Sequence, residues 1–198
     1  MPIIAITGLI GSGKSTVGRY LSSKGLKTID ADAIVRSLQS KDTETFQDIV
    51  SIWGSDIIDK ASGELDRSAL GNIVFSDPVE LEKLEKLVHP KVRVEIIDQL
   101  KNIDSTEIVL LELPLLKTGD RYLEFIDLVL FVEASETTRI TRLIEHRGYS
   151  QDKAEFRVNS QIGGNDRKNL ADHIVNNDGT LQELYVELEN YWTKILSL

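Results

Sequence analysis

The sequence predicts an α/β fold in which a parallel β-sheet is flanked by helices. Two observations carry this prediction. Short apolar runs alternate along the chain with longer segments of helical periodicity, and a glycine-rich loop separates the first apolar run from the first helix. The 198 residues, 41% of them hydrophobic, are enough for one substantial core. We therefore expect a single domain over residues 1–198 that carries inserted lobes.

Five short segments have the character of strands. Three of them are the dense apolar runs expected of parallel strands that are buried on both faces. The five expected strands are Ile3 to Ile6, Thr28 to Asp30, Ile108 to Leu113, Leu128 to Val132 and His173 to Val175.

Helical segments connect these strands. The first is expected from about Lys14 to Ser22, and the pattern from Ala33 to Lys101 is mostly helical. Within it, Asp77-Pro78-Val79-Glu80 is a typical helix start, with Asp as the N-cap and Pro at the first helical position. Pro90 is expected to interrupt this helix, so that a new helix runs to Lys101.

Capping residues mark the later helices. Ser135 is the expected N-cap of one helix, and Ser150 begins the next, which is expected to run through Gln161. Thr180-Leu181-Gln182-Glu183 is a capping box that opens the last helix.

The composition excludes several classes of function. The chain has 32 acidic and 23 basic residues and a net charge of −9, so it lacks the basic footprint of nucleic-acid or anionic-membrane binders. It has no cysteine, and its three histidines have no metal-ligand spacing. No apolar run reaches the roughly 18 residues of a membrane span, and the apolar N-terminus is too short for a signal peptide. We expect a cytoplasmic protein that binds neither nucleic acid nor membranes.

The glycine-rich loop has a specific pattern. Residues Gly8 to Ser15 fit G-x-x-x-x-G-K-[ST] at every fixed position, between an expected buried strand and an expected helix. In such a P-loop, successive backbone N–H groups and the helix N-terminus face a triphosphate. Lys14 would bridge the outer phosphates, and the Ser15 hydroxyl would ligate Mg²⁺. The expected phosphate-binding residues are Gly8, Gly11, Ser12, Gly13, Lys14, Ser15 and Thr16.

Other segments separate the classes of P-loop protein. A GTPase would carry Asn-Lys-x-Asp after a strand, but Leu128 to Val132 is followed by Glu133-Ala134-Ser135. An ATP-driven motor would carry adjacent acids after a strand, whereas Ile108 to Leu111 is followed by Glu112 alone. Asp30-Ala31-Asp32 follows the second strand, at the sheet edge where ligands bind. A carboxylate there can accept the proton of an acceptor hydroxyl, although paired Asp residues also serve as turn residues and helix caps.

The chain resembles the dephospho-coenzyme A kinases, which are small P-loop kinases related to the nucleoside monophosphate kinases. The resemblance runs from Ile3 to about Leu184. Its motifs are Thr7-Gly8 with Gly11-Ser12-Gly13-Lys14-Ser15, Ile29-Asp30-Ala31-Asp32, Ala69-Leu70-Gly71 with Val74-Phe75, Leu87-Val88-His89-Pro90, Pro114-Leu115-Leu116, Arg142-Leu143, Ala154-Glu155 with Arg157 and Gln161, and Ala171-Asp172 with Ile174-Val175-Asn176-Asn177 and Gly179.

This resemblance implies a reaction and a three-part architecture. The reaction is transfer of phosphate from ATP, with Mg²⁺, to the ribose 3′-hydroxyl of 3′-dephospho-CoA, the last step of coenzyme A biosynthesis. The fold would be a three-layer P-loop NTPase core formed by residues of about 1–35, 105–135 and 170–198. A helical CoA-binding lobe would cover about 36–104, and a lid about 136–169.

The resemblance also assigns roles to single residues. Asp32 would be the general base, supported by Asp30, with Lys14 and Arg142 stabilising charge on the transferred phosphoryl group. Further expected nucleotide-binding residues are Arg139, Arg147, Asn177 and Gly179. The expected acceptor-binding residues are Asp30, Asp32, His89, Pro114 and Leu115. For His89, a role in packing or helix capping is an open alternative.

Four positions depart from the family pattern. Leu9 stands where glycine is usual, Lys117-Thr118 replaces an aromatic residue and a Glu, and Gly163-Gly164 replaces a proline-containing turn. In the lid, His146-Arg147 replaces an Arg-Asp pair, so Arg147 would reach the phosphates only if its helix ends there. These departures leave two alternatives open, a kinase for another nucleoside or nucleotide acceptor and a non-catalytic P-loop protein. We expect a monomer or a weak homo-oligomer.

Overall fold

A five-stranded parallel sheet forms the centre of the computed structural model, which describes residues 1–113, 116, 124–161 and 168–195. The strand order is β2-β3-β1-β4-β5, and every neighbouring pair is parallel. The five strands expected from the sequence are all present. Their bounds are β1 Ile3–Gly8, β2 Lys27–Asp30, β3 Val109–Glu112, β4 Leu128–Glu133 and β5 His173–Asn176.

The order of the strands determines where a ligand can bind. The central strand β1 pairs with β3 on one side and with β4 on the other, so the chain changes direction across the sheet at β1. Ligands of open α/β sheets bind beyond the carboxyl ends of the strands at such a switch point. The glycine-rich loop begins at this place, because Gly8 is the last residue of β1.

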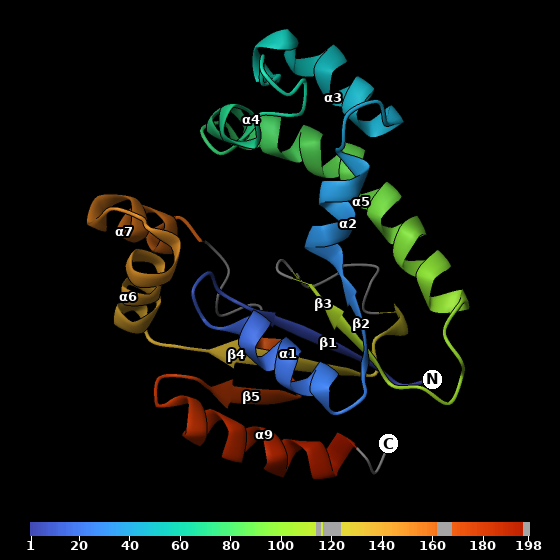
Figure 1. The fold of residues 1–198 in the computed structure, drawn as a ribbon, viewed down its shortest axis with the longest axis vertical. Coiled ribbons are helices and arrows are strands. Elements are labelled where there is room, and N and C mark those ends of the chain that lie inside the picture. The colour runs from blue at the N-terminus through green and yellow to red at the C-terminus, as the bar shows by residue number, and fades with distance from the viewer. Residues whose placement is uncertain (114–115, 117–123, 162–167, 196–198) are drawn as a thin grey trace. The chain divides into compact units, whose positions relative to one another are not determined.

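The chain divides into two compact units, Met1–Asp30 with Ile103–Leu198 and Ala31–Asn102. The first unit holds the sheet and four of the described helices, which are labelled in Figure 1. These are α1 Lys14–Ser23, α6 Glu136–Arg147, α7 Gln151–Asn159 and α9 Leu181–Ile195. The second unit is helical: α2 Ala31–Leu38, α3 Glu44–Trp53, the short 3₁₀ helix η1 Ser55–Ile57, α4 Arg67–Val74 and α5 Pro78–Lys101.

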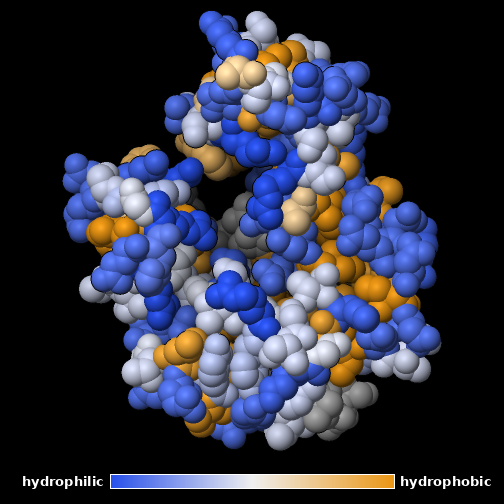
Figure 2. Space-filling model, in the orientation of Figure 1, coloured by the Kyte–Doolittle hydropathy of each residue, from blue (hydrophilic) through white to orange (hydrophobic). Residues whose placement is uncertain are grey.

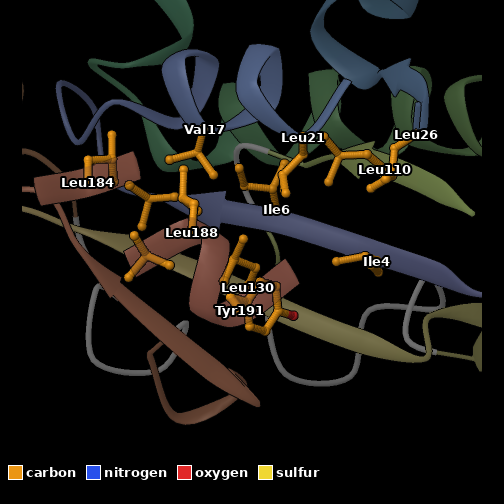
Figure 3. Close-up of a cluster of buried hydrophobic side chains, with 12 residues drawn as sticks. Ile4, Ile6, Val17, Leu21, Leu26, Leu110, Leu130, Leu184, Leu188 and Tyr191 are labelled. Atoms are coloured by element: carbon orange, nitrogen blue, oxygen red, sulfur yellow. The ribbon is translucent and has the colours of Figure 1, made fainter. Parts of the chain in front are cut away.

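One face of the sheet is covered by α1 and α9. Figure 3 shows side chains of the strands, such as Ile6 and Leu130, gathered with Leu21 of α1 and Leu188 of α9. These belong to a cluster of twelve buried residues, here called the sheet core: Ile4, Ile6, Val17, Leu21, Leu26, Leu110, Leu130, Val132, Val175, Leu184, Leu188 and Tyr191. The face of the molecule in Figure 2, by contrast, carries mostly hydrophilic residues.

A second, smaller cluster lies between α6 and α7. Its buried residues are Leu143, Ala154 and Val158, and we call it the lid cluster. Partly buried side chains pack against it, including Ile10 from the loop after β1. The two helices therefore have a core of their own that also contacts the glycine-rich loop.

The helix starts follow the capping residues expected from the sequence. The side chains of Ser135, Ser150 and Asp77 each accept a hydrogen bond from a backbone N–H in the first turn of α6, α7 and α5, respectively. The capping box before α9 is reciprocal, because Thr180 N donates to Glu183 Oε2 and Glu183 N donates to Thr180 Oγ1.

The expected break at Pro90 is wrong, because α5 is one continuous helix of 24 residues that contains Pro90. Its buried residues Val88, Val92, Ile96 and Leu100 recur every four residues on both sides of the proline. A proline inside a helix removes one backbone hydrogen bond, and the burial of this continuous apolar face offsets that loss.

Two smaller expectations also need correction. Asp30-Ala31-Asp32 is not a turn, since Asp30 ends β2 and Ala31 begins α2 directly. The helix after Ser150 ends at Asn159, so Gln161 lies outside it. Within the described residues, no helix is long and apolar enough to cross a membrane.

Candidate active site

The loop after β1 has a backbone that only glycine adopts easily at two of its positions. Gly11 has φ 78° and Gly13 has φ 95°, both in the left-handed region. Neighbouring residues also leave no room for a side chain. A Cβ on Gly11 would lie 2.8 Å from the carbonyl oxygen of Arg139, and a Cβ on Gly13 would collide with the side-chain amide of Asn177. The motif glycines thus allow this loop to turn tightly and allow Arg139 and Asn177 to lie close to its backbone.

The N-terminus of α1 follows this loop directly, so the first backbone N–H groups of the helix face the loop. Gly13 is the N-cap and offers no side-chain hydrogen bond, and the first turn of α1 contains no acidic residue. The first N–H groups of a helix have no partner within the helix, and the helix dipole adds partial positive charge there. This end of α1 is suited to an anion such as phosphate.

Lys14 lies across the loop that precedes it. Its Nζ donates hydrogen bonds to the carbonyl oxygens of Gly8, at 2.9 Å, and Leu9, at 3.2 Å. The ammonium group is therefore held over the loop by its backbone. Ser15 follows on α1 with an exposed side chain, and Thr16 lies beside it with its side chain accepting a hydrogen bond from Arg19.

Asn177 joins the loop to the end of β5. The residue is 5% exposed, and its Nδ2 donates to the carbonyl oxygen of Ser12 at 2.8 Å. Its own N–H donates to the carbonyl oxygen of Glu133, at the end of β4. Gly179 follows two residues later, where a Cβ would collide with the side chain of Glu183 in the capping box of α9.

Arg142 of α6 meets Asn177 beside Ser12 and Gly13, which we call the inner half of the loop. Its Nη2 donates to the Asn177 carbonyl oxygen at 2.8 Å and to Asn177 Oδ1 at 3.4 Å, while Nη1 donates to the Ser12 carbonyl oxygen at 3.4 Å. The structure thus brings together residues that lie 35 and 130 positions apart in the chain.

Arg139 is a buried cation beside the loop. It is only 7% exposed, and among the described residues its Nε and Nη1 have no hydrogen-bond partner. Burial lowers the pKa of Arg139 from its ordinary value, and the charge of Glu136 acts in the opposite direction. Leaving guanidinium nitrogens buried without an acceptor is costly, so this side chain favours an anionic neighbour.

Two acids lie next to each other at the carboxyl edge of the sheet. Asp30 of β2 is in register with Glu112 of β3, and Glu112 is in register with Ile6 of β1. The Glu112 side chain packs against α1, where a Cβ on Gly18 would collide with it. In the sequence, Glu112 stands out only as a poor match to the adjacent acids of a motor protein. An acid directly after an apolar strand was the signal that could have singled it out.

The remaining expected site residues fall in different places. Asp32 is exposed in the first turn of α2, two residues after the end of β2, and His89 is exposed within α5 rather than capping a helix. Arg147 is the last residue of α6, and Gly148 follows in a left-handed conformation. The helix therefore ends at Arg147, which is the condition that the sequence set for Arg147 to reach the phosphates. Pro114, Leu115, Lys117-Thr118 and Gly163-Gly164 lie outside the described residues.

Known structures share the fold of this chain. The chain is similar to the crystal structure of TT1252 from Thermus thermophilus, with a TM-score of 0.79 and 32% identity over 98% of this chain and 97% of that one. It is also similar to the dephospho-CoA kinase from Campylobacter jejuni, with a TM-score of 0.70 and 26% identity over 98% and 96% of the two chains. The shikimate kinase from Acinetobacter baumannii, at 16% identity and a TM-score of 0.58 over 100% and 94% of the chains, shares the P-loop kinase fold.

Sequence relatives give the same result. The dephospho-CoA kinase of Symbiobacterium thermophilum is 40% identical over 196 residues, which cover 97% of this chain and 80% of the relative. The dephospho-CoA kinase of Thermobifida fusca is 34% identical over 195 residues, or 97% and 95% of the two chains. The family model for dephospho-CoA kinase matches residues 2–183, which include the loop, Asp32, the helices α6 and α7 (here called the lid helices) and Asn177. The chain therefore belongs to the dephospho-CoA kinase family, a family of phosphotransferase enzymes.

Proposed function

We propose that this enzyme transfers the γ-phosphate of ATP to the ribose 3′-hydroxyl of 3′-dephospho-CoA, producing CoA and ADP, the last step of coenzyme A biosynthesis. The observation that carries the proposal is the P-loop at the carboxyl end of β1, joined by Arg142 and Asn177, in a chain of the dephospho-CoA kinase family. Among P-loop proteins, this combination favours a small-molecule kinase.

The loop and the start of α1 would bind the triphosphate. Backbone N–H groups of the loop and of the first turn of α1 would surround the phosphates, apart from those of Ile10 and Ser12, which donate to Gln161 and Leu9. The Lys14 ammonium would move from the loop carbonyls to the outer phosphate oxygens. Mg²⁺ fits beside them, because the exposed Ser15 side chain at the start of α1 offers the hydroxyl oxygen that such an ion accepts as a ligand. When bound, Mg²⁺ would neutralise charge on the β- and γ-phosphates.

Asp32 is our candidate for the general base, with Asp30 as a supporting acid. The 3′-oxygen of the acceptor would attack the γ-phosphorus while its proton passes to the Asp32 carboxylate. The bond from the γ-phosphorus to the β–γ bridging oxygen breaks, and its electron pair leaves with ADP. The position of Asp32 two residues after β2 supports this assignment, because the chain leaves the carboxyl edge of the sheet there.

The nucleoside of ATP would lie at Asn177 and Gly179, close to the inner half of the loop. Arg142 already contacts Asn177 and would stabilise charge on the transferred group by extending along the loop. Arg139 and Arg147 would supply further positive charge to the phosphates. Two guanidinium nitrogens of the buried Arg139 have no hydrogen-bond partner among the residues that the structure describes, which supports an anionic ligand there. The acceptor would be bound by the helical unit, with His89 as a candidate contact, and by Pro114 and Leu115 of the first unit.

The test is an ADP-release assay with purified protein, ATP, Mg²⁺ and a panel of acceptors. We expect turnover with dephospho-CoA, and a loss of about 10²- to 10⁴-fold in kcat for Asp32→Asn, the range for a positioned general base. ATP binding should be nearly unchanged in this variant. Asp98→Asn, which changes an exposed acid paired with Lys101 on α5, is the matched control and should keep full turnover.

Other results would identify a different function. Turnover with another nucleoside or nucleotide, but none with dephospho-CoA, would contradict the acceptor and keep the enzyme class. ATP binding without turnover on any acceptor would favour a non-catalytic P-loop protein.

A further inference from the structure

The outer half of the phosphate loop, residues 9–11, is held by the lid helices. The N–H of Ile10 donates to Oε1 of Gln161 at 2.6 Å, across 151 positions of sequence. Gln161 lies two residues beyond the end of α7. The end of α7 therefore determines where Gln161 lies, while its side-chain amide contacts the loop.

Two further contacts connect the same part of the loop to the lid. The Ile10 side chain packs against the lid cluster of Leu143, Ala154 and Val158. Gly11 lies directly against the backbone of Arg139, because a Cβ on Gly11 would be 2.8 Å from the carbonyl oxygen and 3.1 Å from the Cα of Arg139. Backbone, side chain and amide contacts thus all tie the outer half of the loop to α6 and α7.

The hydrogen bond from Ile10 has a consequence for Lys14. The N–H of Ile10 and the C=O of Leu9 belong to one peptide group, which is planar and directs the two in opposite directions. The Leu9 carbonyl oxygen accepts hydrogen bonds from Lys14 Nζ and from the N–H of Ser12, each at 3.2 Å. Fixing the N–H side of this peptide with Gln161 therefore fixes the carbonyl side that holds the Lys14 ammonium.

We propose that Gln161 is a positioning residue for the phosphate loop. Through the Leu9–Ile10 peptide it sets the orientation of the loop and the place of the Lys14 ammonium, and it couples lid position to phosphate binding. Gln161 acts through the peptide and has no contact with the nucleotide in this scheme. The proposal rests on ATP binding at the loop and is independent of which acceptor the enzyme uses.

The test compares Gln161→Leu, which removes the acceptor, with Gln161→Glu, which keeps an acceptor oxygen at the same distance along the side chain. In nucleotide-free protein, amide exchange of Ile10 should be about 3- to 10-fold faster in Gln161→Leu, as expected for one lost hydrogen bond, and close to wild type in Gln161→Glu. Gln151→Leu is the matched control. Gln151 is a lid glutamine whose Nε2 donates to Glu155, and its substitution should leave Ile10 unchanged.

Nucleotide affinity separates positioning from general damage. For Gln161→Leu we expect the Kd for ATP to rise about 3- to 10-fold, while the Kd for AMP, which lacks the outer phosphates, changes less than about 2-fold. Unchanged Ile10 exchange in this variant, or equal weakening of ATP and AMP, would overturn the proposal. If Gln161→Leu does not fold, Gln161→Asn replaces it, because its side chain is shorter by one methylene and should also lose the bond. Absence of dephospho-CoA turnover in the wild type would refute the proposed function alone.

Discussion

The sheet core and the lid cluster differ greatly in size. In the part of the chain that the structure describes, the sheet core joins twelve buried residues from four strands, two helices and the segment before β2, whereas the lid cluster has three from two helices. Fully burying one aliphatic side chain stabilises a protein by about 1.5–3 kcal/mol. The sheet can therefore place the end of β1 firmly. The lid cluster buries few apolar side chains of its own, and Ile10 and Gln161 connect it to the loop.

This difference suggests that the lid helices unfold locally at a lower free energy than the sheet. Segments with few buried apolar contacts unfold locally well below the global transition. In the proposed enzyme, loosely held helices α6 and α7 would be able to admit and release nucleotide, while a firmly held β1 would keep the phosphate loop at the sheet edge. The following predictions test this division, beginning with the largest effect.

Leu188→Ala should destabilise the whole first unit. Leu188 of α9 is 0% exposed in the sheet core, and truncating a buried leucine costs about 2–5 kcal/mol. Urea unfolding followed by circular dichroism measures this change. Val186→Ala on the same helix is the control, because Val186 is 55% exposed and its truncation should cost less than about 0.5 kcal/mol. Equal losses in the two variants would contradict the assigned sheet core.

Tyr191 should make the sheet core sensitive to alkali. Burial, assisted by the charge of Asp172, raises the pKa of Tyr191 from 10.0 to about 12. The folded protein therefore holds the phenolic proton more tightly than the unfolded chain. The protonated phenol therefore contributes to the free energy of unfolding below pH 10, and this contribution is lost as the pH rises from about 10 to 12. It amounts to at most about 2.7 kcal/mol, at about 1.36 kcal/mol per pKa unit.

Urea unfolding at pH 9 and pH 11.5 measures this loss. Tyr191→Phe should remove most of the decrease between the two pH values, because no phenolic proton is left to dissociate there. Tyr149→Phe, in a residue that packs against the lid cluster, should leave the decrease as it is in the wild type. A Tyr191→Phe protein with an unaltered decrease would show that another group is responsible.

Leu143→Ala should have the smallest effect on global stability, although Leu143 is 1% exposed. If the lid opens separately from the sheet, the unfolding transition of the sheet should shift by less than about 1 kcal/mol. Amide exchange should become at least about 10-fold faster in α6 and α7 and remain unchanged in β1 and β4. A loss of 2–5 kcal/mol in the global transition, typical of a core leucine, would instead show that lid and sheet unfold together.

Much of the fold could be predicted from local signals. Each strand was visible as a short apolar or β-branched run, and Ser135, Ser150 and the capping box at Thr180 marked helix starts through bonds within four residues. Pro90 shows the limit of this reasoning. The local rule for proline predicted a break, but the buried face from Val88 to Leu100 kept one helix intact.

The candidate site was predictable only in part. Gly8 to Thr16 were found because the chemistry of a phosphate loop is contained in one short segment. Glu112 was missed as a neighbour of Asp30, because the register of two strands some eighty residues apart is not a local property. Gln161 was visible only as part of a family motif, and nothing local connects it with Ile10.

By itself, the sequence determined that a phosphate loop follows a buried strand and that an acid pair lies at the end of the next strand, because backbone conformation and motif spacing are encoded within a few residues. Only the tertiary structure decided which distant groups meet this loop. Arg142 and Asn177 reach its inner half and Gln161 its outer half, since the order of the parallel strands and the packing of α6 and α7 bring them there.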